Sequence, residues 1–262
     1  MDELKSIYSK VIDEHRSWLK HFGQQYLNKW EKLLKDQPEA AICEAKARKL
    51  LSDHDTNVEP QEDISHGGPD FLCTKNCKRF YVEATCITKE KATQKTALDD
   101  DSQGATYYAL LTKTFLRELC NKTRQCSNLN KPCIVVIGTF HFRAGCACFG
   151  KYAAEDLLTG TPQISIKFDP DQGRAIGDIY ETTDLRDSAF IRFDKTSKGQ
   201  IECARNPISA VLLCNFRSLP TSVVGVLHPN PNQNFDRTLL SKIEFCRLAD
   251  EWQMGQFSAE WI

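Results

Sequence analysis

Apolar side chains recur at intervals of three, four and seven residues along the first part of the chain, which is the spacing of one helix face. This pattern predicts one or two amphipathic helices over residues 2–35, with a bend at Gly23. Pro38 suits the first turn of a further helix, which we expect to run to about Ser52. Residues 53–67 are polar and are expected to form turns.

Short apolar runs bounded by turn residues follow, and they indicate strands. Two strands are expected at residues 70–73 and 79–88, joined by a polar hairpin connection. A helix is predicted over residues 104–122. The uninterrupted apolar run at residues 133–138 predicts a central strand that is buried on both faces. The order helix, hairpin, helix, strand therefore follows from periodicity alone.

The remaining segments show weaker periodicity. Residues 89–103 are charged and polar, include the acidic cluster Asp99–Asp101, and are expected to form a surface excursion. The other expected elements are strands near residues 164–168, 189–193, 208–216 and 222–227, turns at 184–188 and 194–199, and a last helix over residues 236–251.

The bulk composition excludes some classes of protein. The chain has 262 residues, 41% of them hydrophobic, which is ordinary for a globular protein. Its formal net charge of -1 gives no general attraction to nucleic acid, so a DNA or RNA partner would require a local basic face. No apolar run approaches a membrane span and the charged N-terminus lacks a signal-peptide core, so we expect no membrane contact and a cytoplasmic location.

Twelve cysteines are scattered along the chain. Without an export signal they are interpreted as reduced thiols, most of them small core residues. A zinc site would have to use Cys73 with Cys77, or Cys146 with Cys148, and neither pair has the repeated CxxC spacing of zinc sites. A zinc-stapled structural protein is therefore the weakest alternative.

Two carboxylates stand out against their apolar surroundings. Asp70 ends a Gly-Gly-Pro turn at the beginning of one expected strand, and Glu83 lies inside the next, Phe80–Ile87. A buried carboxylate is costly unless a metal, a cation or a strong donor pairs with it. Taken alone, Asp70 is typical of a turn and Glu83 is compatible with an exposed sheet face. Taken together on neighbouring strands, they predict a shared divalent-cation site.

The pair Pro69-Asp70 and the triplet Glu83-Ala84-Thr85 resemble the motif of the PD-(D/E)xK nuclease superfamily. The resemblance covers about residues 38–140. It implies an α/β fold with a restriction-endonuclease-like core, in which the order α-β-β-α-β gives a mixed sheet flanked by helices. Residues 1–37 would then be an N-terminal helical segment, and residues 38–262 one domain with additional C-terminal strands.

The resemblance also implies an activity, which is Mg²⁺- or Mn²⁺-dependent hydrolysis of phosphodiester bonds in DNA or RNA. Asp70 and Glu83 would bind the metal, and Glu44 would add an outer ligand if its helix packs beside the hairpin. A solvated charge at the edge of an apolar stripe is the alternative for Glu44. The catalytic lysine of the pattern is replaced by Thr85, which can donate one hydrogen bond but carries no charge.

Other residues are candidates for accessory roles. Lys75 and Lys78 in the hairpin turn, or Lys113 on the later helix, could replace the missing lysine, although turn lysines are more often plain surface charges. Gln103 and Tyr107 are spaced i, i+4 and resemble the Gln-x-x-x-Tyr element of helicase-associated nucleases. Core packing of Tyr107 and a surface position for Gln103 are the alternative.

Two functional hypotheses remain open at this point. The first is a metal-dependent nuclease that uses Asp70 and Glu83. The second is a catalytically inactive module that kept the nuclease fold and lost turnover with the change to Thr85. A basic groove beside Asp70 would favour nucleic acid in either case, and an acidic or apolar surface would favour a protein partner. The sequence does not define the oligomeric state.

Overall fold

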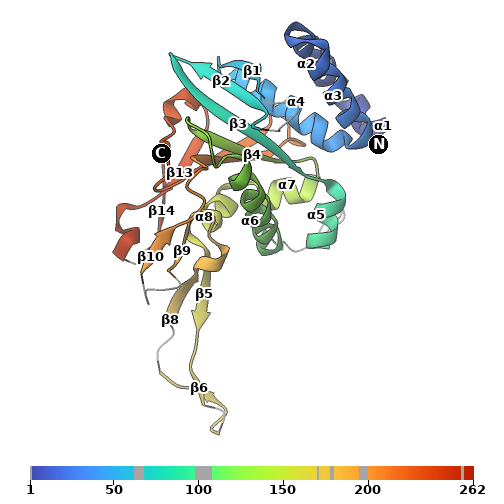
Figure 1. Cartoon of the computed structure of the whole chain (residues 1–262). Helices are drawn as coiled ribbons and strands as arrows, with labels where there is room; N and C mark the ends of the chain where they lie inside the picture. Colours follow the sequence, from blue (N-terminus) through green and yellow to red (C-terminus); the bar gives the residue numbers. More distant parts are fainter. Residues whose placement is uncertain are drawn as a thin grey trace.

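An eight-stranded mixed β-sheet runs through the centre of the molecule (Figure 1). Its strand order is β1-β2-β3-β4-β11-β12-β13-β14. The computed structural model describes residues 2–61, 68–97, 108–169, 171–177, 180–194, 200–254 and 257–262. The strands of the sheet are β1 (Asn57–Pro60), β2 (Phe71–Lys75), β3 (Lys78–Ile87), β4 (Cys133–Thr139), β11 (Ala210–Asn215), β12 (Ser222–Leu227), β13 (Glu244–Leu248) and β14 (Ala259–Trp261).

Helices cover both faces of this sheet. One face packs against α1 (Asp2–Ile7), α2 (Ser9–Phe22), α3 (Gln24–Asp36) and α4 (Pro38–Asp53). The other face packs against α5 (Lys89–Thr96), α6 (Tyr108–Gln125), α7 (Phe142–Cys148) and α8 (Lys151–Thr159). The side chains of β4 alternate between the two cores, because Ile134 and Val136 belong to the first cluster and Val135 and Ile137 to the second. The chain is therefore an α/β protein in three layers.

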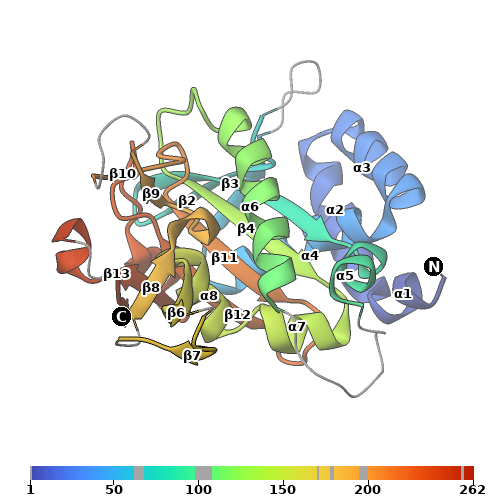
Figure 2. The ribbon, with the colours of Figure 1, turned by 90° about the horizontal axis from the view of Figure 1, so that it is seen from below.

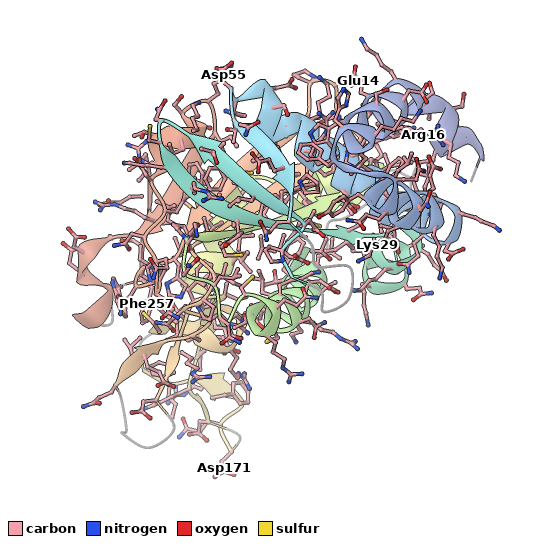
Figure 3. All side chains as sticks on the ribbon, turned by 45° about the horizontal axis from the view of Figure 1, so that its top comes forward. Glu14, Arg16, Lys29, Asp55, Asp171 and Phe257 are labelled. Atoms are coloured by element: carbon pink, nitrogen blue, oxygen red, sulfur yellow. The ribbon has the colours of Figure 1, made fainter. Side chains whose placement is uncertain are left out.

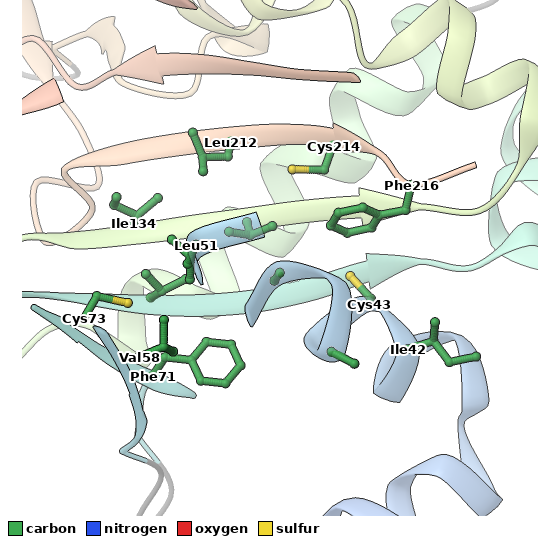
Figure 4. Packing of buried hydrophobic residues seen from close by; sticks show 14 of the residues in the cluster. Ile42, Cys43, Leu51, Val58, Phe71, Cys73, Ile134, Leu212, Cys214 and Phe216 are labelled. Carbon is green, nitrogen blue, oxygen red and sulfur yellow. The ribbon is translucent and has the colours of Figure 1, made fainter. Parts of the chain in front are cut away.

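The N-terminal half of the fold agrees closely with the expected pattern. A break at Gly23 separates α2 from α3, and Pro38 opens α4. Figure 4 shows Cys43 of α4 facing the central strands, close to Phe216. A Cβ added to Gly138 of β4 would lie 2.3 Å from Phe216 Cε2 and 2.8 Å from Cys43 Sγ, so glycine is required for this close approach.

The β2–β3 hairpin determines where the two singled-out carboxylates lie. Asn76 and Cys77 form its two-residue turn and have positive φ angles of 49° and 61°, which is the geometry of a type I′ turn. The strands are antiparallel, and Phe71 pairs with Val82. Continuing this register by one residue places Asp70 opposite Glu83. The expected hairpin is thus confirmed, with a tighter turn than its polar connection indicated.

The connection from β3 to β4 passes through α5 and α6. The two strands are parallel neighbours, and Glu83 is in register with Val135. A parallel pair needs such a crossover, and α6 packs over the second core with Phe115 and Leu119 fully buried. Helix α6 consequently lies beside the face of β3 from which Glu83 projects.

Some expectations about the irregular segments were wrong. The polar residues 53–67 include the edge strand β1, and the charged segment 89–103 begins with α5. Thr88 caps α5 by accepting a hydrogen bond from the backbone N–H of Lys91, which accounts for a helix in so polar a segment. The acidic cluster Asp99–Asp101 lies outside the described residues.

The last helix expected over residues 236–251 is also wrong. That segment contains the short 3₁₀ helix η2 (Arg237–Leu240) and then the strand β13, and the 3₁₀ helix η3 (Asp250–Met254) follows. Residues of β13 pair in parallel with β12, and Phe245 packs over Gly225. Pairing with a distant strand therefore overrides the local helical spacing.

Smaller hairpins extend from the sheet. They are formed by β5 (Thr161–Ser165) with β8 (Tyr180–Asp184), by β6 (Phe168–Asp169) with β7 (Arg174–Ala175), and by β9 (Ile191–Phe193) with β10 (Ile201–Cys203). The expected turn at 184–188 is the 3₁₀ helix η1 (Leu185–Asp187). Asp171, between β6 and β7, lies far from the sheet (Figure 3). Across the described ranges, none of the helices combines the length and apolarity needed to cross a membrane.

Candidate functional site

A groove of about 580 Å³ lies where α3, α4, β3 and α6 meet. We call it the carboxylate groove, because it is lined by Glu44 of α4, by Asp70 just before β2 and by Glu83 of β3. Lys122 and Gln125 of α6 also line it. The outer wall is provided by side chains of α3, among them Tyr26, Lys29 (Figure 3) and Leu33. The structure therefore brings together the three carboxylates that the sequence singled out.

Asp70 is held in place by the neighbouring strand. The backbone N–H of Ala84 donates a hydrogen bond to Asp70 Oδ2 over 2.7 Å. Desolvation raises the pKa of the Asp70 carboxyl well above its usual range, and the nearby charges of Glu83 and Glu44 raise it further. The Ala84 N–H and Lys122 oppose this rise without cancelling it. The groove therefore holds more negative charge than its own donors stabilise.

Lys122 supplies the positive charge nearest to the carboxylates. Its Nζ lies 2.5 Å from Glu83 Oε1, and the side chains of Lys122 and Glu83 are only 17% and 4% exposed. Burial lowers the pKa of Lys122, but Glu83, Asp70 and Glu118 raise it by more, so the net shift is upward. The ammonium group is therefore protonated at neutral pH, and it compensates the charge of a carboxylate that would otherwise be costly to bury.

The sequence contained a signal for Lys122 that the analysis of motifs missed. Leu111, Phe115 and Leu119 form the buried stripe of α6 at intervals of four, and Lys122 follows three residues later. Lys122 thus continues the apolar stripe of its helix. A lysine on a buried stripe requires a partner, in the same way as a glutamate in an apolar strand.

Thr85, which occupies the lysine position of the pattern, also lines the carboxylate groove. It lies two residues after Glu83, so both side chains project from the same face of β3. The Thr85 carbonyl accepts a hydrogen bond from Cys43 Sγ over 3.4 Å, which connects this point of the strand to α4.

The three lysines proposed as substitutes are not brought to the groove. Lys75 Nζ donates to the carbonyl oxygen of His54 over 2.5 Å, and Lys78 Nζ forms an ion pair with Asp236 at 2.6 Å. Lys113 is exposed on α6. None of the three is among the described residues that line the carboxylate groove. Gln103 and Tyr107, the other accessory candidates, lie outside the described residues.

Glu44 approaches the groove from a buried aromatic environment. Its Oε1 lies 3.8 Å from Nε2 of His15, and the His15 ring packs against Trp18 and Trp30. Burial lowers the pKa of His15 more than Glu44 raises it, so this histidine is neutral at pH 7. Glu44 therefore gains little charge compensation from α2.

The donor set decides which cation fits. Within the part of the chain that the structure describes, no group of three or more His, Cys, Asp or Glu side chains is arranged to hold a metal ion. Magnesium, however, is usually bound by one or two carboxylates and several waters, and Asp70 and Glu83 provide two. Burial, and after it the charges of Glu83 and Glu44, raise the pKa of Asp70, and a bound cation would oppose this rise. The residues present fit Mg²⁺ or Mn²⁺ on these terms.

Comparison with family models, with curated proteins and with solved structures finds no match to this chain. The fold by itself defines an α/β protein with a large mixed sheet flanked by helices. The site defines a carboxylate groove in which Lys122, 17% exposed, pairs with Glu83.

Proposed function

We propose that this protein is a metal-dependent nuclease with a restriction-endonuclease-like core, which hydrolyses phosphodiester bonds of DNA or RNA. The observation that carries the proposal is the ion pair of Lys122 with Glu83 in a groove shared with Asp70 and Glu44. Two acidic residues on a hairpin and one lysine are the functional set of the PD-(D/E)xK pattern. Here the lysine comes from α6 instead of position 85.

The order of elements supports the same proposal. Helix α4 precedes the antiparallel strands β1, β2 and β3, and α6 then leads to β4, which is parallel to β3. The expected core consisted of a helix, a hairpin, a second helix and a central strand. The carboxylates lie at the start of β2 and inside β3, which are the positions that the motif requires.

Each side chain has a distinct part in the proposed reaction. Asp70 and Glu83 would hold the cation, which supplies electrostatic stabilisation of the charge that develops on the phosphate. The Ala84 N–H orients Asp70, and Lys122 orients Glu83. The Lys122 ammonium is also placed to attract a phosphate oxygen that enters the groove, because it is protonated and partly exposed.

The test is a cleavage assay on plasmid DNA and on single-stranded RNA with Mg²⁺ or Mn²⁺. Asp70→Asn, Glu83→Gln and Lys122→Met should each lower the rate about 100-fold or more, the usual scale for loss of one stabilising group. Lys78→Met is the matched control, since Lys78 also pairs with a carboxylate but lies outside the groove. Cleavage that survives in the groove variants would overturn the assignment of the site.

A catalytically inactive module is the second candidate. The observation in its favour is that Lys122 already neutralises Glu83 without a cation. Nucleic-acid binding by the wild type, with no cleavage in either metal and no calorimetric heat of metal binding, would establish this candidate and exclude the nuclease.

A further inference from the structure

A second groove, of about 670 Å³, lies on the other side of α6. Figure 2 shows α6 between the α2–α3 helices on one side and the β9–β10 hairpin on the other. Four arginines line this groove, and we call it the arginine groove: Arg124 of α6, Arg186 of η1, Arg192 of β9, and Arg205, which follows β10. None of the described residues that line it is an aspartate or a glutamate.

Partial charge compensation leaves the arginine groove basic. Arg186 pairs with Asp184 at 2.6 Å, and Arg192 pairs with Glu202 at 2.6 Å. Asp187 adds a third nearby negative charge at Arg186, so three carboxylates stand against four guanidinium groups. The Arg186 and Arg192 side chains are 87% and 55% exposed, so both ion pairs are open to exchange with a competing anion.

Arg205 is the anchored member of this set. One guanidinium nitrogen donates to the carbonyl oxygen of Ala189, and Nη2 lies 3.1 Å from Cys120 Sγ. Its Nε is buried and makes no hydrogen bond to any described residue. Arg205 has a positive φ of 62°, directly after β10, and its side chain lines the groove. The guanidinium is therefore fixed in place without a carboxylate to neutralise it.

One helix connects the two grooves. Lys122 and Gln125 line the carboxylate groove, whereas Cys120, Thr123 and Arg124 line the arginine groove. At 100° per residue these two sets project from opposite sides of α6. A nucleic acid that passes over the C-terminal half of α6 would therefore have one segment beside Arg124 and an adjacent segment at the mouth of the carboxylate groove.

We propose that the arginine groove binds the phosphodiester backbone of a nucleic acid whose adjacent segment enters the carboxylate groove. The planar guanidinium group binds phosphate oxygens through paired hydrogen bonds. A row of several guanidinium groups therefore suits a polymer whose negative charges repeat at regular intervals. This inference rests on the proposed function, and it adds the surface that holds the substrate.

The test measures binding of a fluorescein-labelled single-stranded DNA or RNA of about 20 nucleotides by anisotropy, with wild-type protein in EDTA so that cleavage is excluded. Arg124→Ala and Arg192→Ala should each raise Kd about 5- to 10-fold. In the double variant the slope of log Kd against the logarithm of the salt concentration should decrease by about two, which corresponds to two fewer counterions released on binding. Arg247→Ala is the control, because Arg247 also forms an exposed ion pair but lies on β13. Arg205 is left unchanged because its hydrogen bonds support the fold.

The possible outcomes separate this inference from the proposed function. An unchanged Kd in the double variant, together with cleavage by the wild type, would overturn the arginine groove and leave the nuclease standing. Weaker binding in the arginine variants, with no cleavage by the wild type, would support the groove and overturn the nuclease. Equal competition by polyglutamate would show that the groove takes acidic protein instead, and would also overturn the inference.

Discussion

The two grooves beside α6 use charge in opposite ways. In the carboxylate groove Glu83 and Lys122 are largely withdrawn from water, and the Lys122 ammonium compensates Glu83 at 2.5 Å. In the arginine groove the paired guanidinium groups remain largely exposed, and their carboxylates lie outside the lining. A charge in the first groove therefore affects the folded state itself, whereas a charge in the second mainly affects what binds. Mutations on the two sides of one helix should separate these effects.

The largest effect is expected for Lys122→Met. Removal of the ammonium takes away the positive charge that Lys122 places beside the buried Glu83, which should lower the free energy of unfolding by about 3 kcal/mol. The double variant Glu83→Met, Lys122→Met should recover most of that loss, because neither charge of the pair remains. Urea denaturation at neutral pH measures both. Equal stability of wild type and Lys122→Met would mean that the pair contributes nothing to folding.

His228, which contacts Ala204 in the wall of the arginine groove, should give the next largest effect. Its Nε2 lies 2.9 Å from the Ala204 carbonyl oxygen, its Nδ1 accepts from the N–H of Asn230, and burial lowers its pKa to about 4. The unfolded chain takes up this proton near pH 6.5 and the folded chain only near pH 4. Stability should therefore fall by about 3 kcal/mol as the pH decreases across that interval.

His228→Gln is the variant that isolates this contribution. It retains a side chain that can donate and accept hydrogen bonds but removes the ionisation. Its unfolding free energy, followed by urea denaturation from about pH 7 to about pH 4.5, should fall less steeply than that of the wild type. Parallel curves would assign the acid sensitivity to other groups.

Asp70→Asn should have a smaller effect of the opposite sign. The pKa of Asp70 is raised in the folded protein, so its charged form costs stability at neutral pH, and that cost disappears as the pH falls through the raised pKa. Asparagine keeps an oxygen for the Ala84 N–H but carries no charge. We expect a higher free energy of unfolding at pH 7, with loss of cleavage. A less stable variant would show that Asp70 is structural.

The smallest change in stability is expected for Arg192→Ala. The side chains of Arg192 and Glu202 are 55% and 40% exposed, and exposed pairs contribute about 0.5 kcal/mol or less. The thermal unfolding midpoint should therefore move by no more than a few degrees. A large destabilisation would contradict the difference between the two grooves.

Local pattern was sufficient to predict the elements that hold Asp70 and Glu83. The apolar runs around them gave both strands of the hairpin, and the run at residues 133–138 gave β4. Asp70 and Glu83 lie side by side because the two strands are antiparallel, and the turn that joins the strands sets their register. Lys122 was missed because it matches no motif, although its place on a buried stripe was readable.

The arginine groove could not be predicted in the same way. Its four arginines come from positions 124, 186, 192 and 205, and only the folded chain brings them to one side of α6. The net charge of -1 conceals this local excess of positive charge, because acidic residues elsewhere in the chain balance it. The helix expected at residues 236–251 failed for a related reason, since β13 depends on pairing with β12.

Helix α6 also acts as a spacer of fixed width. A helix with its side chains is about 10 Å across, and successive phosphates of one strand of B-form DNA are separated by about 3.4 Å along the axis. A molecule that reaches both grooves at once must therefore span at least the width of this helix, which is several nucleotide steps. A free mononucleotide is too short to reach both grooves, so the helix sets a minimum length for any ligand that uses them together.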